Sequence, residues 1–216
     1  MRPATTLIIC NGQPPSHNLI RQLARQARFI IAADGGANGA RKAGIVPDMI
    51  IGDLDSITPS TRKHFASTRI VHINRQDNTD LEKVLDYCLS NKRKHIVIVG
   101  ATGRRLDFTL GNLSVVWKYA GRLDIRFESD ECTAVPAGKR FSTAVRIGAV
   151  ISLIPFGECR GITLRGLKYP LVNATMNVGE IGVSNVAVQS RVTVIVQYGN
   201  MMVLVGKNYS KARQRP

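Results

Sequence analysis

Six short apolar runs alternate with segments of helical spacing through the first 127 residues, and this alternation restricts the fold more than any other feature. In residues 107–120, for example, Leu110, Leu113 and Trp117 fall on one side, which predicts a helix with these three residues facing inward. Strands that alternate with helices predict an α/β domain with a mostly parallel sheet and helices on both faces. The apolar runs are residues 6–10, 29–33, 49–51, 69–73, 95–99 and 123–127.

The pattern changes after Ser129, where helical spacing ends and short runs rich in Val, Ile and Thr follow. Gly199-Asn200 stands between the last two runs and predicts a tight hairpin. We therefore expect an α/β domain over residues 1–128 and an all-β sandwich domain over residues 129–216. The later runs are residues 150–154, 162–164, 183–188, 192–197 and 201–205.

The chain has 216 residues and a net charge of +15, from 30 basic and 15 acidic residues. This excess of basic residues favours polyanionic ligands such as nucleotides or nucleic acid. A proteome whose proteins are generally basic explains the excess at least as well. The four cysteines have no paired spacing, which favours reduced thiols. No apolar run is long enough to span a bilayer, and the N-terminus lacks a signal-peptide pattern, so we expect a cytoplasmic protein without a membrane partner.

Glycine or charged residues follow almost every strand predicted in the first domain. The carboxyl ends of parallel strands lie at one edge of the sheet, where open α/β sheets bind ligands. We therefore expect five polar segments to converge at this edge. They are Asn11-Gly12, Asp34-Gly35-Gly36, Gly52-Asp53, Gln76-Asp77 and residues 100–103.

Asp53 and Asp55 follow the third apolar run with one residue between them. In extended backbone they face the same side, and a hard cation such as Mg²⁺ relieves the repulsion between two close carboxylates. A solvated turn explains the same residues equally well. Asp80 would add a third carboxylate. The competing explanation is that Asp80 stabilises the first turn of a helix, since Thr79 and Glu82 have the spacing of a capping box at the start of that helix.

Residues 100–107 join the fifth predicted strand to a helix. Backbone N–H groups in such a loop bind phosphate, and Arg104 or Arg105 can add a bidentate contact. The segment is neither a Walker sequence nor a G-x-G-x-x-G motif, so it indicates phosphate binding only weakly by itself. Asp107 is a candidate catalytic residue, and helix capping is the competing explanation.

Taken together and in order, these motifs resemble those of the thiamine pyrophosphokinase family, over about residues 8–205. The motifs are residues 33–38 (ADGGAN), 52–56 (GDLDS), 76–80 (QDNTD), 102–107 (TGRRLD), 166–171 (GLKYPL) and 183–185 (VSN).

The resemblance implies a homodimeric enzyme that transfers diphosphate from ATP to the hydroxyl of thiamine, giving thiamine diphosphate and AMP, with Mg²⁺. It implies an acceptor site in which Ser184 and Asn185 of the sandwich and Gln76 meet thiamine. The metal ligands that it implies are Asp53, Asp55 and Asp80. The other site residues are Gln76, Arg105 and Asp107 as catalytic residues and Asn11, Gly12, Asp34, Gly35, Thr102, Gly103 and Arg104 as ATP-binding residues.

The sequence departs from the family pattern at two points. Phe108 stands where many relatives have histidine, and no tryptophan follows Asn185 to stack on thiamine. One alternative is a diphosphokinase for another hydroxymethyl acceptor, such as a pterin. The other is a basic nucleic-acid-binding module, but the few aromatic residues are not interleaved with the basic runs, and clustered aspartates repel phosphate unless a metal is bound.

Overall fold

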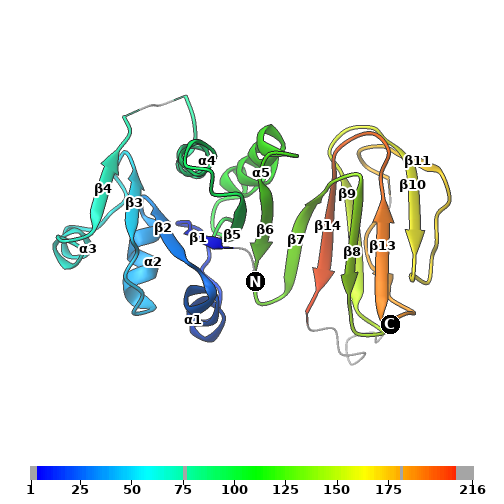
Figure 1. The fold of residues 1–216 in the computed structure, drawn as a ribbon, viewed down its shortest axis with the longest axis horizontal. Coiled ribbons are helices and arrows are strands. Elements are labelled where there is room, and N and C mark those ends of the chain that lie inside the picture. The colour runs from blue at the N-terminus through cyan, green and yellow to red at the C-terminus, as the bar shows by residue number, and fades with distance from the viewer. Residues whose placement is uncertain (1–3, 75–76, 181, 208–216) are drawn as a thin grey trace. The chain divides into compact units, whose positions relative to one another are not determined.

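The computed structural model describes residues 4–74, 77–180 and 182–207, so the predicted site residue Gln76 lies outside the described residues. The chain divides into two compact units, Met1–Asp130 and Glu131–Pro216 (Figure 1). Each unit is described by itself below.

Six parallel strands form the sheet of the first unit, in the order β6-β5-β1-β2-β3-β4 (Figure 1). This confirms the mostly parallel sheet that the alternation predicts. The chain starts in the middle at β1, builds outward through β4, and then returns to place β5 on the other side of β1. The strands are β1 (Thr5–Ile9), β2 (Phe29–Ala33), β3 (Met49–Gly52), β4 (Arg69–His72), β5 (His95–Val99) and β6 (Asp124–Glu128).

Helices connect these strands, and side-chain caps fix three of the helix starts. The hydroxyls of Ser16, Thr58 and Thr79 each accept a hydrogen bond from the backbone N–H three residues later. Among the described residues, no helix is both long and apolar enough to cross a membrane. The helices are α1 (His17–Gln26), α2 (Gly36–Lys42), α3 (Pro59–His64), α4 (Asp80–Ser90), α5 (Leu106–Val115) and the 3₁₀ helix η1 (Val116–Tyr119).

Apolar side chains of alternate strand positions build the core of this unit. Leu7 and Ile9 of β1 pack with Ile20 and Leu23 of α1, whereas α4 packs against β2 and β3. This packing fixes where each strand ends and each following helix begins.

The prediction for the last helix of the first unit was partly wrong. Leu110 is 57% exposed, and the chain changes from α to 3₁₀ geometry at Val116. Val116 and Tyr119 lie in the 3₁₀ segment and are buried instead, because its three residues per turn do not continue the helical spacing past Val115.

The second unit contains two antiparallel sheets, with strand orders β12-β9-β14-β7 and β11-β10-β13-β8. Residues of both sheets, such as Ile151, Val203, Ile162 and Val194, form one hydrophobic core. This confirms a separate antiparallel β region. The strands are β7 (Cys132–Ala137), β8 (Arg140–Ala144), β9 (Val150–Pro155), β10 (Cys159–Arg165), β11 (Ala174–Met176), β12 (Asn185–Val186), β13 (Arg191–Ile195) and β14 (Met201–Gly206).

The hairpin predicted at Gly199-Asn200 is wrong. The strands on either side of it, β13 and β14, do not pair with each other but lie in different sheets. β13 pairs with β8 and β10, and β14 pairs with β7 and β9. The Gly-Asn pair therefore carries the chain from one sheet to the other, because each strand finds its partners far away in the sequence.

Candidate active site

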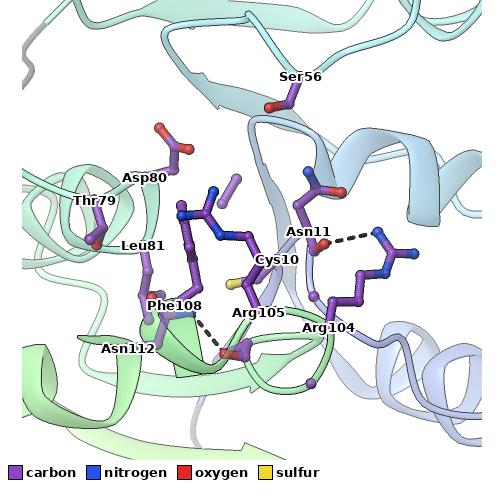
Figure 2. Close-up of a pocket in the computed structure, with 14 residues that line it drawn as sticks. Cys10, Asn11, Ser56, Thr79, Asp80, Leu81, Arg104, Arg105, Phe108 and Asn112 are labelled. Carbon is purple, nitrogen blue, oxygen red and sulfur yellow. Dashed lines mark hydrogen bonds between the residues drawn. The ribbon is translucent and has the colours of Figure 1, made fainter. Parts of the chain in front are cut away.

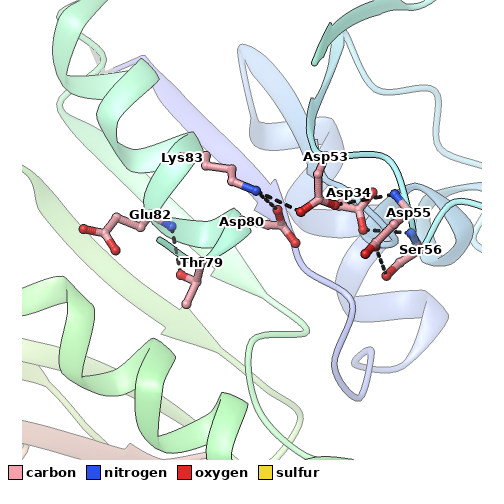
Figure 3. Close-up of polar contacts among 8 residues, drawn as sticks. All are labelled: Asp34, Asp53, Asp55, Ser56, Thr79, Asp80, Glu82 and Lys83. Atoms are coloured by element: carbon pink, nitrogen blue, oxygen red, sulfur yellow. Dashed lines mark hydrogen bonds and ion pairs between the residues drawn. The ribbon is translucent and has the colours of Figure 1, made fainter. Parts of the chain in front are cut away.

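Three carboxylates meet at the carboxyl ends of β2 and β3. Asp34 follows β2, Asp53 follows β3, and Asp80 opens α4. Each offers one oxygen, and these three oxygens lie within 4.8 Å of one another (Figure 3). We call Asp34, Asp53 and Asp80 the carboxylate cluster. A separation of this size lets all three oxygens bind one cation.

Asp34 is the buried member of the cluster, with 1% of its surface exposed. Its Oδ2 accepts a hydrogen bond of 3.2 Å from the Ser56 N–H, whereas none of the described residues hydrogen-bonds to its buried Oδ1. Burial raises the pKa of Asp34, and the hydrogen bonds from the Gly35 backbone and from Ser56 oppose this only in part. A buried carboxylate oxygen of this kind needs a partner, and a cation supplies one.

Lys83 is a functional candidate that the sequence analysis missed. It lies on α4, with only 3% of its surface exposed, and donates hydrogen bonds of 3.1 Å to Asp53 Oδ2 and 3.0 Å to Asp80 Oδ1 (Figure 3). Burial acts to raise the pKa of Asp53, but the hydrogen bond from Lys83 and that from the Asp55 N–H outweigh it and hold this pKa below its ordinary value. Burial dominates at Asp80, so the pKa of Asp80 is raised despite Lys83.

Asp55 lies beside the carboxylate cluster but is not part of it. Its Oδ1 accepts a hydrogen bond of 2.8 Å from the Ser56 hydroxyl, and its N–H approaches Asp53 Oδ1 at 3.5 Å. Leu54, with φ of 69°, turns the backbone between the two aspartates, so the extended path that would point both to one side is interrupted. Asp55 as a direct metal ligand therefore stays a prediction.

A cavity of about 280 Å³ opens where β1 and β5 lie side by side (Figure 2). Its wall includes Asn11 and Gly12 after β1, Arg104 and Arg105 after β5, and Asp80 of the cluster. The strand order reverses between β1 and β5, and open α/β sheets bind ligands at such a reversal. The cavity and the cluster thus share one edge of the sheet.

Backbone contacts fix the loops on both sides of this cavity. Gly12 N–H donates to the Gly100 carbonyl at 2.6 Å, and Gln13 N–H donates to the Thr102 carbonyl at 2.8 Å. Asn112 of α5 is buried and donates to the Ala101 carbonyl at 2.8 Å (Figure 2).

Close packing also brings the predicted residues Asn11 and Gly35 together. A Cβ at Gly35 would lie 2.2 Å from Asn11 Nδ2, so the glycine is required for this approach. The predicted phosphate-loop residue Gly103 uses its N–H within the loop, donating to the Thr109 hydroxyl at 3.0 Å.

The arginines of the loop have different partners. Arg104 donates to the Asn11 carbonyl at 3.2 Å (Figure 2). Arg105 forms a bidentate ion pair with Asp107, at 2.5 and 3.2 Å, and its guanidinium lies 4.3 Å from the Phe108 ring centroid. The hydrogen bond from Arg105 lowers the pKa of Asp107, which weakens this carboxylate as a base.

A second cavity, of about 620 Å³, shares Cys10, Asn11, Gly12 and Arg104 with the first. Its lining also includes the cationic side chains of Arg41 and Lys42 but no carboxylate. Burial raises the pKa of the Cys10 thiol to about 12, so it is not a thiolate nucleophile although it lines both cavities. The two cavities together are lined by four cationic side chains, Arg41, Lys42, Arg104 and Arg105, and by the carboxylate of Asp80.

Ser184 and Asn185 lie in the second unit. Ser184 is exposed, adopts φ of 62°, and donates its N–H to the Ser152 hydroxyl at 3.1 Å. Asn185 is 7% exposed, and its side chain exchanges two hydrogen bonds with the backbone of Tyr169. Asn185 therefore holds the 166–171 segment against β12.

Family models match both units of the chain. Residues 20–127 match the model described as thiamin pyrophosphokinase, catalytic domain, and residues 140–201 match that described as thiamin pyrophosphokinase, vitamin B1 binding domain. The chain belongs to the thiamine pyrophosphokinase family. This confirms the resemblance found in the sequence, and neither alternative considered there is favoured.

Known members of the thiamine pyrophosphokinase family align along most of the chain. Thiamine pyrophosphokinase of Bacillus subtilis (strain 168) is 32% identical over 182 residues, covering 81% of this chain and 85% of the relative. Thiamine pyrophosphokinase 1 of Oryza sativa subsp. japonica is 28% identical over 200 residues, covering 78% and 75%. The crystal structure of the Bacillus subtilis protein superposes with a TM-score of 0.83 at 28% identity, covering 95% of this chain and all of that one.

Proposed function

We propose that this protein is an ATP-dependent thiamine diphosphokinase. It transfers a diphosphate from ATP to the hydroxyl of thiamine and releases thiamine diphosphate and AMP. Membership of the family supports the reaction. The observation that carries the proposal within this chain is the carboxylate cluster beside a cavity at the strand-order reversal.

The cluster suits Mg²⁺ as the resident ion. It offers three hard oxygen donors, and the Asp34 Oδ1 is buried without a hydrogen-bond partner among the described residues. Asp34, Asp53 and Asp80 would hold the ion, with Asp55 as a further predicted ligand. When bound, Mg²⁺ neutralises charge on the phosphate oxygens of ATP.

The chain's own residues position the reactants. Thr102, Gly103 and Arg104, together with Asn11, Gly12 and Gly35, bind the phosphates of ATP at the cavity. Arg105 exchanges part of its ion pair with Asp107 for a contact to phosphate. A guanidinium that makes two parallel hydrogen bonds suits a phosphate group as well as a carboxylate. Asp107 accepts a hydrogen bond from the thiamine hydroxyl and orients it for attack on the β-phosphorus.

We further propose that residues 1–128, with helices on both sheet faces, form the catalytic domain. Residues 129–216 form a sandwich that contributes to thiamine binding and to a homodimer, with Ser184 and Asn185 near the acceptor. Gln76 completes this set as a predicted contact to thiamine. The buried thiols of Cys10 and Cys88 fit a reducing cytoplasm.

The reaction itself provides the test of this function. Protein mixed with ATP, Mg²⁺ and thiamine should yield AMP and thiamine diphosphate in equal amounts. Chromatography measures both products. Matched reactions lack thiamine, lack Mg²⁺, or contain a hydroxymethyl pterin in place of thiamine. Formation of ADP as the product, or AMP formation only with the pterin, would contradict the proposal.

Ser184→Ala should raise the KM for thiamine about 3- to 10-fold and leave kcat within about twofold, because one hydrogen bond to the acceptor is lost. Steady-state kinetics at saturating ATP measure this split. Ser190→Ala, at another exposed serine of the second unit, is the control and should behave as the wild type. An unchanged KM in Ser184→Ala would remove this residue from the site.

A further inference from the structure

Lys83 places a buried ammonium group between two members of the carboxylate cluster. Its side chain is 2% exposed, and its Nζ lies 3.1 Å from Asp53 and 3.0 Å from Asp80 (Figure 3). α4 positions it, since Lys83 follows Asp80 by three residues and so lies on the same side of the helix. A buried charge is costly unless it is paired, and here one cation faces two anions.

We propose that Lys83 sets the charge of the carboxylate cluster so that the site matches one divalent cation and disfavours trivalent ions. This rests on the metal role in the proposed function. When ionised, the three carboxylates carry three negative charges, and the ammonium leaves a net charge of minus two. One Mg²⁺ balances this charge. Without Lys83 the cluster would match a trivalent ion instead.

The alternative is that Lys83 only holds α4 to the loop after β3. The two roles differ in what they predict for ion selectivity. If Lys83 acted only through the shape of the site, its loss would weaken the binding of divalent and trivalent ions alike. A charge-setting lysine changes the ratio of the two affinities, since each ion responds to one added negative charge in proportion to its own charge.

The test compares Tb³⁺ and Mn²⁺ binding to the metal-free full chain by calorimetry. In Lys83→Met, which keeps the length of the side chain but removes its charge, the ratio of Tb³⁺ to Mn²⁺ affinity should rise at least about tenfold. Lys83→Arg keeps the charge and should keep the wild-type ratio. Lys118→Met removes an ammonium that pairs with Glu82 at 2.6 Å but is 62% exposed, and it should also keep the ratio.

Thermal unfolding gives a second readout. Mg²⁺ should raise the melting temperature of Lys83→Met more than that of the wild type, because the uncompensated carboxylates are then neutralised by the ion. If Lys83→Met is unfolded without metal, recovery of its fold in Mg²⁺ supports the proposal, and Lys83→Gln then provides the titration. Unfolding of both neutral variants with and without Mg²⁺ would overturn it.

The outcomes separate this inference from the proposed function. If the wild type binds Mn²⁺ but the ratio is unchanged in Lys83→Met, the charge-setting role is wrong and the metal site stands. If the wild type binds neither ion, the metal role of the cluster fails, and the inference about Lys83 fails with it.

Discussion

Asp53→Asn and Asp80→Asn should each lower the rate of thiamine diphosphate formation at least about a hundredfold while the protein remains folded. Each change removes one negative oxygen ligand from the carboxylate cluster, and losses of preorganised electrostatic stabilisation have effects of this size. The fold should survive because an asparagine oxygen still accepts the hydrogen bond from Lys83. AMP release at saturating substrates and circular dichroism measure the two properties.

Two further variants sharpen this result. Asp124→Asn alters an exposed carboxylate at the first residue of β6, at the opposite edge of the sheet, and should leave the rate unchanged. Asp55→Asn should lower the rate less than Asp53→Asn does, because Asp55 lies outside the cluster and accepts a hydrogen bond from Ser56. Near-normal rates in both Asp53→Asn and Asp80→Asn would refute the metal role of the cluster.

Gly52→Ala should damage the site through backbone contact alone. A Cβ at this position would lie 2.6 Å from the Cβ of Asp34 and 3.1 Å from its Cα. Because both residues are buried at strand ends, Asp34 must move away from the cluster. We expect a loss of about 1–3 kcal/mol in the free energy of unfolding and at least a tenfold lower rate.

The matched control for Gly52→Ala is Gly111→Ala. Gly111 lies inside α5, and apart from its chain neighbours and the backbone of its own helix no atom is within 4 Å of the position a Cβ would take. This variant should gain about 0.5–1 kcal/mol in the free energy of unfolding, because alanine favours the helix, and should keep its activity. Urea unfolding and rate measurements test both variants, and wild-type activity in Gly52→Ala would show that Asp34 is not needed in its present position.

The sequence predicted the first unit well because its signals are local. Each β-to-α transition is marked by a strand of apolar residues and then by glycine, aspartate or a capping threonine, as at Asp34, Asp53 and Thr79. Once the strands are known to be parallel, their carboxyl ends must share one edge. The convergence of the segments that contain Asp34 and Asp53 therefore followed from topology. The predicted metal set was Asp53, Asp55 and Asp80, and in the structure Asp34 takes the place of Asp55 in the cluster.

Other features depend on contacts that a single sequence does not reveal. A lysine in an amphipathic helix normally faces water, so the sequence did not predict the burial of Lys83. Its spacing of three residues from Asp80 was a usable signal, because it places both side chains on the same side of the helix. The residues Gly199-Asn200 are typical of a hairpin turn. Only the pairing of β13 with β8 and β10, and of β14 with β7 and β9, shows that no hairpin forms there. Asp55 lies outside the cluster because the positive φ at Leu54 turns the backbone between Asp53 and Asp55.

The most direct test of this account is to locate the metal. Crystals grown with Mn²⁺ and a non-hydrolysable ATP analogue should show an anomalous peak about 2.1 Å from oxygens of Asp34, Asp53 and Asp80, with the analogue's phosphates on its open side. The same experiment with Asp53→Asn should weaken or remove the peak. A metal peak bound elsewhere on the chain, with these three carboxylates left uncoordinated beside a bound nucleotide, would contradict the central claim.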